Sequence, residues 1–225
     1  MKAPASRLAP WRWQDGASAV LLAGLQTLLL WQGRPALLKG WHAVLVFWST
    51  RMGHAWLAGE AVFTPLPSRG TVLLTGLLCA LAYWLAGRWH EPFWPWRVLV
   101  RTLCLVQASA CLFLLWSPAR FPYGLSQHLH MLLELGANFM LGMPLMLCMG
   151  WSLLRLPWHL KLLGPIGVLA YFAVWLPHQA MLHLWLLSQL SVLFMPLLFL
   201  CFGILLDGWI FVALYAWLAS LTPRV

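Results

Sequence analysis

The sequence predicts an all-α, polytopic integral membrane protein, a helix bundle with about seven transmembrane helices and a range of six to eight. Of the 225 residues, 62% are hydrophobic and 8% are charged, whereas about a quarter of the residues of a soluble domain are charged. Several apolar runs reach the roughly 17–25 residues that span a bilayer. Many of the 17 tryptophans lie near the ends of these runs, at the headgroup level that their rings favour.

The N-terminal quarter of the chain contains a basic segment and two apolar runs. Residues 1–16 are predicted to be a cytoplasmic N-terminal segment, and 17–225 a single transmembrane helical domain. The first apolar run, 17–32, is expected to end at the Gln-Gly-Arg-Pro sequence of residues 32–35. The next run, 36–50, is short for a span, so we expect it to lie in the interface or to re-enter; if it crosses, the count rises to eight.

The rest of the chain supplies the other expected spans. Asp207 and Gly208 have the composition of a tight turn and are expected to separate the last two helices. The expected spans are 70–87, 97–117, 128–152, 162–177, 184–206 and 208–222.

The distribution of charged residues predicts the orientation of the chain in the membrane more than it predicts a binding partner. The net charge of +9 comes from 14 Lys and Arg against five acids, and the basic residues occur mostly singly, in short loops. This pattern is typical of the positive-inside rule and excludes a nucleic-acid-binding patch. With seven spans and the N-terminus inside, most basic residues lie on the cytoplasmic side.

The five cysteines lie inside apolar runs, and none has Cys-x-x-Cys spacing. A buried cysteine commonly serves as a small hydrophobic residue, and we expect that role here. Cys104 and Cys111 are seven residues apart, on one face of a helix. A paired site for a soft metal is therefore the alternative.

The densest polar group occurs at 126–139. His130, Glu134 and Asn138 are spaced by four residues and share one helix face, while His128 points to nearly the opposite side. An ionisable residue within a membrane is costly and usually faces a partner or a wet cavity. His130 is the expected neighbour of Glu134. The pair is interpreted as part of a metal site, a proton relay or a hydrogen bond between helices.

A second polar group surrounds Met181, which His178 and His183 flank. In the seven-span arrangement these histidines lie at the same depth as His128 and His130. Four neutral imidazoles near one level suit a copper site, with Met131 and Met181 as candidate soft ligands. The alternative is a set of interfacial histidines in contact with water.

A row of methionines follows at every third position: Met140, Met143, Met146 and Met149. Steps of three residues rotate the row by about 60° each, and the rise of about 1.5 Å per residue carries it roughly 15–30 Å away from His130. Pro144 is expected to kink this helix. The row therefore cannot complete one site with His130, and it is interpreted as packing or as a relay of weak soft ligands.

The stretch 117–150, SPARFPYGLSQHLHMLLELGANFMLGMPLMLCMG, resembles the caa-type cytochrome c oxidase assembly factors, the CtaG-like membrane family. His130-Met131 and Pro144-Leu145 resemble two motifs of one family span, although Glu134 stands where the family has a second histidine. Trp175 to His178, followed by His183, resembles a later motif. The resemblance implies about seven spans, the bacterial inner membrane and copper delivery to the oxidase.

Together these features predict an inner-membrane accessory protein without catalysis, which holds or passes copper at the outer face. His128, His130, His178 and His183 would bind the metal, while Glu134 and Asn138 would orient these ligands or relay protons. The expected partners are the lipid bilayer and cytochrome oxidase subunits or a periplasmic copper carrier, and no nucleic acid.

Two alternatives belong to other classes. The first is a small integral-membrane enzyme or transporter for a lipid-linked or envelope substrate. In it, Glu134 and His130 would act as acid and base, and Arg120 would hold an anionic group. The second is a structural subunit whose apolar helices pack on partner proteins.

Overall fold

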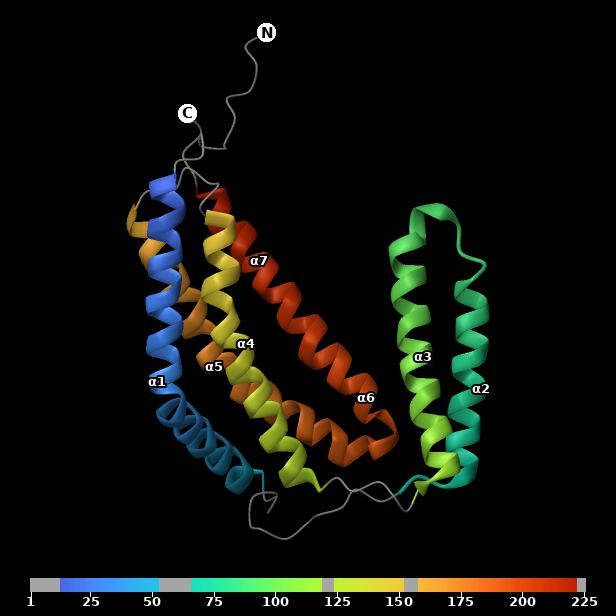
Figure 1. Cartoon of the computed structure of the whole chain (residues 1–225). Helices are drawn as coiled ribbons and strands as arrows, with labels where there is room; N and C mark the ends of the chain where they lie inside the picture. The colour runs from blue at the N-terminus through green and yellow to red at the C-terminus, as the bar shows by residue number, and fades with distance from the viewer. Residues whose placement is uncertain (1–12, 53–65, 119–123, 152–157, 222–225) are drawn as a thin grey trace. The chain divides into compact units, whose positions relative to one another are not determined.

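The computed structural model describes residues 13–52, 66–118, 124–151 and 158–221, and every element in these ranges is helical (Figure 1). Within these ranges, six helices are long and apolar enough to cross a membrane, so the chain is an all-α, multi-pass membrane protein. Six lies within the expected range but replaces the seven spans favoured from the sequence. The candidate spans are Gly16–Arg51, Arg69–Ala86, Glu91–Trp116, Leu125–Gly150, His159–Leu190 and Val192–Ser220.

The expected break at residues 32–35 is wrong. Helix α1 runs without interruption from Trp13 to Arg51 and contains Pro35, so the run 36–50 is not a separate span. Figure 1 shows α1 bending along its length. A proline inside a helix removes one N–H and crowds the carbonyl four residues earlier, so it can kink a helix without ending it.

The expected turn at Asp207-Gly208 is also wrong. The π-helix η4 (Phe199–Leu205) continues directly into α7 (Leu206–Ser220). The chain turns instead at Ser191, whose Oγ accepts a hydrogen bond from the backbone N–H of Leu193 at 3.2 Å. The expected helices 162–177 and 184–206 therefore do not exist as such. Residues 162–177 and 184–190 belong instead to one helix, α5 (Trp158–Leu190), which contains Pro165 and Pro177.

Three short elements join α5 to α7. They are the 3-10 helix η3 (Val192–Phe194), α6 (Met195–Leu198) and η4. Pro196 lies in the first turn of α6, where a missing N–H costs no hydrogen bond. These elements and α7 form one apolar segment that is long enough to cross a membrane.

The chain divides into two compact units. The first comprises Met1–His54, His130–Ala180 and Asp207–Val225; the second comprises Ala55–Leu129 and Met181–Leu206. The single domain expected for 17–225 stays a prediction.

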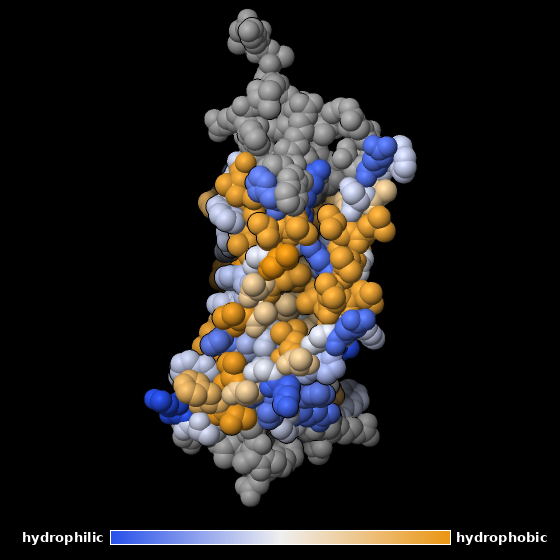
Figure 2. All heavy atoms as spheres, turned by 90° about the vertical axis from the view of Figure 1, so that its left-hand side faces the viewer, coloured by the Kyte–Doolittle hydropathy of each residue, from blue (hydrophilic) through white to orange (hydrophobic). Residues whose placement is uncertain are grey.

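The first unit is built from α1, most of α4 (Leu125–Trp151), most of α5, and α7. In Figure 1, α1 and α5 run in one direction and α4 and α7 in the other. The indole Nε1 of Trp41 donates to the carbonyl of Ala173 at 2.7 Å and joins α1 to α5. The Phe139 ring packs edge-on against Phe172 and Phe211. Figure 2 shows hydrophobic residues over the middle of the α1 side of the molecule and hydrophilic residues towards its ends.

The second unit contains α2 (Arg69–Ala86), η1 (Glu91–Phe93) and α3 (Trp94–Trp116). Helices α2 and α3 form an antiparallel hairpin (Figure 1). The amide Nε2 of Gln107 on α3 donates to the carbonyl of Leu193 at 2.8 Å. Of the cysteines in this hairpin, Cys111 is buried and Cys79 and Cys104 are half-buried.

The methionine row wraps around α4 as its spacing predicts. Met140 and Met143 are 2% and 0% exposed, whereas Met146 and Met149 are 50% and 75% exposed. The first two therefore pack in the protein core, and the last two face outwards.

We therefore expect Met143→Ala to lower the free energy of unfolding by about 2 kcal/mol or more, because it leaves a cavity in a close-packed site. Met146→Ala, the matched control on the same helix at a half-exposed position, should change it by less than about 0.5 kcal/mol. Denaturant unfolding in detergent measures both. Equal losses in the two variants would contradict this account of the row.

Candidate metal site

Two histidines from different helices face each other in the second unit. His128 lies in the first turns of α4 and His183 lies in the last third of α5. Their Nε2 atoms are 3.1 Å apart, and the ring centroids are 5.1 Å apart with the rings inclined at 43°. Each histidine is 1% exposed. The structure thus joins two of the four histidines singled out in the sequence.

One hydrogen bond joins the two imidazole rings. A neutral imidazole has one N–H donor and one acceptor nitrogen, so one Nε2 must donate and the other accept. The Nδ1 atom of His128 is buried and has no partner among the described residues. Because a buried N–H without an acceptor is rare, we assign the proton of His128 to Nε2, which donates to Nε2 of His183.

The surroundings of the pair are apolar. The Phe199 ring lies 6.5 Å from the His128 ring, centroid to centroid. Leu129 and Leu184, the next residues along each helix, are 3% and 1% exposed. Two imidazolium cations could not stay at this separation in such a setting, since their repulsion is only weakly screened. Burying even one imidazolium without a counterion is also costly, so both rings are neutral, the form that binds metals.

His130 and His178 are placed differently. Both side chains are exposed, and both residues belong to the first unit. His178 Nδ1 lies 2.7 Å from the carbonyl of Val174 on its own helix, and its ring packs edge-on against Trp48 at 6.1 Å. In the part of the chain that the structure describes, no three His, Cys, Asp or Glu side chains are close enough to hold a metal.

Glu134 has a different partner from the one expected. It forms a hydrogen-bonded ion pair with Arg34, which lies in the middle of α1. The two side chains are 31% and 25% exposed. The break expected at residues 32–35 puts Arg34 outside any helix, so this ion pair was not predicted from the sequence. The signal was present, since a lone arginine and a lone glutamate inside apolar helices can neutralise each other.

The remaining candidates do not gather around the imidazoles as one set. Asn138 is exposed and Met131 is 39% exposed, whereas Met181 is 4% exposed. Met181 lies two residues before His183, so the two side chains leave α5 in nearly opposite directions. Arg120, the anion-binding candidate of the enzyme alternative, lies outside the described residues.

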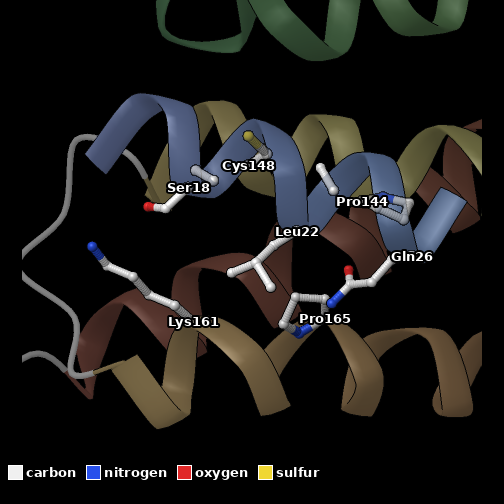
Figure 3. A pocket seen from close by; sticks show the side chains of 9 residues that line it. Ser18, Leu22, Gln26, Pro144, Cys148, Lys161 and Pro165 are labelled. Atoms are coloured by element: carbon white, nitrogen blue, oxygen red, sulfur yellow. The ribbon is translucent and has the colours of Figure 1, made fainter. Parts of the chain in front are cut away.

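A small cavity lies in the first unit, between α1, α4 and α5 (Figure 3). Its volume of about 30 Å³ is enough for one or two water molecules. Gln26 Nε2 is buried there without a partner among the described residues. Pro144 and Pro165 line the cavity, and each proline leaves a helix carbonyl without its usual donor. The cavity therefore suits water better than a metal. Its lining is Ser18, Ala19, Leu22, Ala23, Gln26, Pro144, Cys148, Lys161 and Pro165.

No protein-family model, curated protein or solved structure matches this chain. The resemblance to oxidase assembly factors therefore stays a prediction.

The ion pair leads to a stability prediction. Glu134→Gln leaves Arg34 without its counterion between apolar helices, and should lower the free energy of unfolding by about 2 kcal/mol. This is less than the loss of roughly 3–5 kcal/mol for a fully buried pair, since both groups are partly exposed. The double variant Arg34→Gln, Glu134→Gln should be more stable than the sum of the two single losses predicts.

Denaturant unfolding of the three variants in detergent measures this coupling. Lys39→Gln is the matched control, because Lys39 is an exposed cation on the same helix. Additive losses in the double variant would contradict the pairing.

Proposed function

We propose that this chain is a membrane accessory protein that holds one Cu(I) ion between His128 and His183 and passes it on. The observation that carries the proposal is the contact between two buried, neutral Nε2 atoms at 3.1 Å, contributed by two different helices. Imidazole nitrogen is a good ligand for copper. The apolar surroundings favour an ion of low charge over a divalent one.

The number of ligands favours Cu(I) over zinc. Structural zinc requires four ligands, and catalytic zinc requires three from the protein. The described residues offer two facing nitrogens without a third His, Cys, Asp or Glu nearby. Cu(I) accepts two ligands in a line, so a pair of imidazoles is sufficient for it. Two bonds of about 2 Å in a line require the Nε2 atoms to be about 4 Å apart, so the rings would have to separate from their present 3.1 Å when the ion binds.

The chain's own residues would do three things at this site. His128 and His183 would supply the two nitrogens. The proton of His128 would move from Nε2 to Nδ1 when the ion binds, and this N–H would then need a water or a rearranged side chain as its acceptor. Phe199, whose ring lies 6.5 Å from that of His128, would exclude water. A site with two ligands leaves room for a ligand of a partner protein, which suits transfer. The family resemblance suggests an oxidase subunit or a periplasmic copper carrier in the bacterial inner membrane as that partner.

Metal content measured after purification in detergent under reducing conditions tests the proposal. We expect about one copper per chain in the wild type and a loss of copper in His128→Ala and in His183→Ala. His130→Ala and His178→Ala are matched controls, because both residues are exposed histidines on the same two helices. Full copper content in His128→Ala or His183→Ala would overturn the proposal, as would a metal-free wild type that binds no added Cu(I).

Six crossings also suggest an orientation for the chain. Successive connections alternate between the two sides of the membrane. One side has more basic residues near the helix ends, and we expect this side to be the cytoplasmic one. The metal pair, near the start of α4 and the end of α5, would then lie towards the outer face. Among the described residues near helix ends, the richer side has Arg88, Arg97, Arg101 and Lys161, and the other side has Arg51 and Arg69.

Epitope tags inserted at two described connections measure this orientation. A tag after His90 should be reached by antibody only in permeabilised cells, because it follows the basic end of α2. A tag after Pro67 is the matched control and should be reached in cells whose cytoplasmic membrane is intact. The reverse pattern would contradict the orientation.

A further inference from the structure

Asp207 is a buried acid in an apolar helix. It is the second residue of α7, directly after the π-helix η4, and it is 9% exposed. Trp175 on α5 donates its indole N–H to Oδ1 of Asp207 at 3.3 Å. A π-helical turn often marks a functional site, and an ionisable residue inside a membrane protein suggests one by default.

No cation balances the charge of this carboxyl group in the described part of the chain. Arg34 is paired with Glu134, and the groups that act on Asp207 are the side chains of Gln179 and Trp175, both on α5 and both uncharged. No charged or titratable side chain from the described parts of α1, α4 or α5 acts on it.

Gln179 gives a second sign of a ligand. Its side chain is 6% exposed and lies beside the Asp207 carboxyl, one helical turn from Trp175. Its Nε2 has no hydrogen bond of normal geometry among the described residues, so its contact with the carboxyl group is incomplete. A buried amide without an acceptor is costly, so this position is expected to hold a water or to change partners with the state of Asp207.

The energies favour a neutral carboxyl group. Taking an ionised carboxylate out of water costs more than hydrogen bonds from two neutral donors return. Trp175 and Gln179 together therefore cannot stabilise the charge. The carboxyl group is stable here only when a cation neutralises it, and a proton is the cation that needs no space of its own.

We propose that Asp207 is a proton-binding site within the membrane-spanning part of the chain. The carboxylate takes up one proton from water on Oδ2, because Oδ1 accepts the hydrogen bond from Trp175. The product is a neutral carboxylic acid whose O–H can donate to Gln179. This site is separate from the imidazole pair, and its ligand is a proton instead of a metal.

Isotope labelling can isolate this group without disturbing it. The sequence contains just two aspartates, Asp15 and Asp207, so carboxyl-¹³C aspartate labelling of an Asp15→Asn variant leaves Asp207 as the sole labelled side chain. Infrared and ¹³C spectra of the full chain in lipid bilayers then distinguish carboxylic acid from carboxylate. The measurement is made near pH 5, about one unit above the ordinary pKa of an exposed aspartate.

We expect a protonated C=O signal that shifts in D₂O and disappears in alkaline buffer. The signal should be absent from the labelled Asp15→Asn, Asp207→Asn variant. A carboxylate signal with no protonated signal near pH 5 would overturn the proposal. A protonated signal that disappears on addition of Na⁺ or K⁺ at constant pH would also overturn it, in favour of a metal-cation site.

Discussion

The fold depends on one constraint: a polar side chain in an apolar helix must find its partner on another helix, because the hydrocarbon offers none. Four of the contacts that meet this requirement here involve an ionisable or amide side chain. Arg34 joins α1 to α4, and Asp207 joins α7 to α5. Gln107 joins α3 to the turn after α5, and His128 joins α4 to α5. Each contact fixes which helices are neighbours inside its unit.

The four contacts differ in what they leave unsatisfied. The Arg34–Glu134 pair neutralises both charges, so its role is structural. The His128–His183 pair is neutral, and we propose that its bridging proton moves to Nδ1 of His128 when both Nε2 atoms bind Cu(I). Asp207 has hydrogen-bond donors but no cation beside it among the described residues. The polar groups of this chain that are open to a ligand are therefore those whose charge or hydrogen bonds are not fully satisfied by a neighbour.

Composition and apolar run length were enough to predict the class of fold, because a chain with 8% charged residues cannot cover a water-facing surface. Helix ends were harder. Pro35 and Gly208 both weaken a helix, yet α1 and α7 continue through them. Their local cost is small compared with the cost of exposing backbone groups to lipid. Local turn signals therefore have less weight in a membrane protein than in a soluble one.

A contact between histidines of two helices could be predicted from the sequence, but the residues that form it could not. Spacing along one helix placed His130 beside Glu134, whereas the partner of Glu134 is about 100 residues away on α1. The histidines that do meet, His128 and His183, are 55 positions apart. No helical periodicity connects such residues. The packing of the helices decides which helix faces meet, and therefore which side chains come into contact.

We propose that two imidazole nitrogens of this chain, and no sulfur, hold the Cu(I) ion. X-ray absorption of the purified protein loaded with Cu(I) distinguishes the two ligand types, because nitrogen and sulfur differ in bond length and scattering. We expect two nitrogen neighbours at about 2 Å, as in other metal–imidazole bonds, and no sulfur. Sulfur neighbours at about 2.3 Å would contradict it and would transfer the site to the methionines or cysteines.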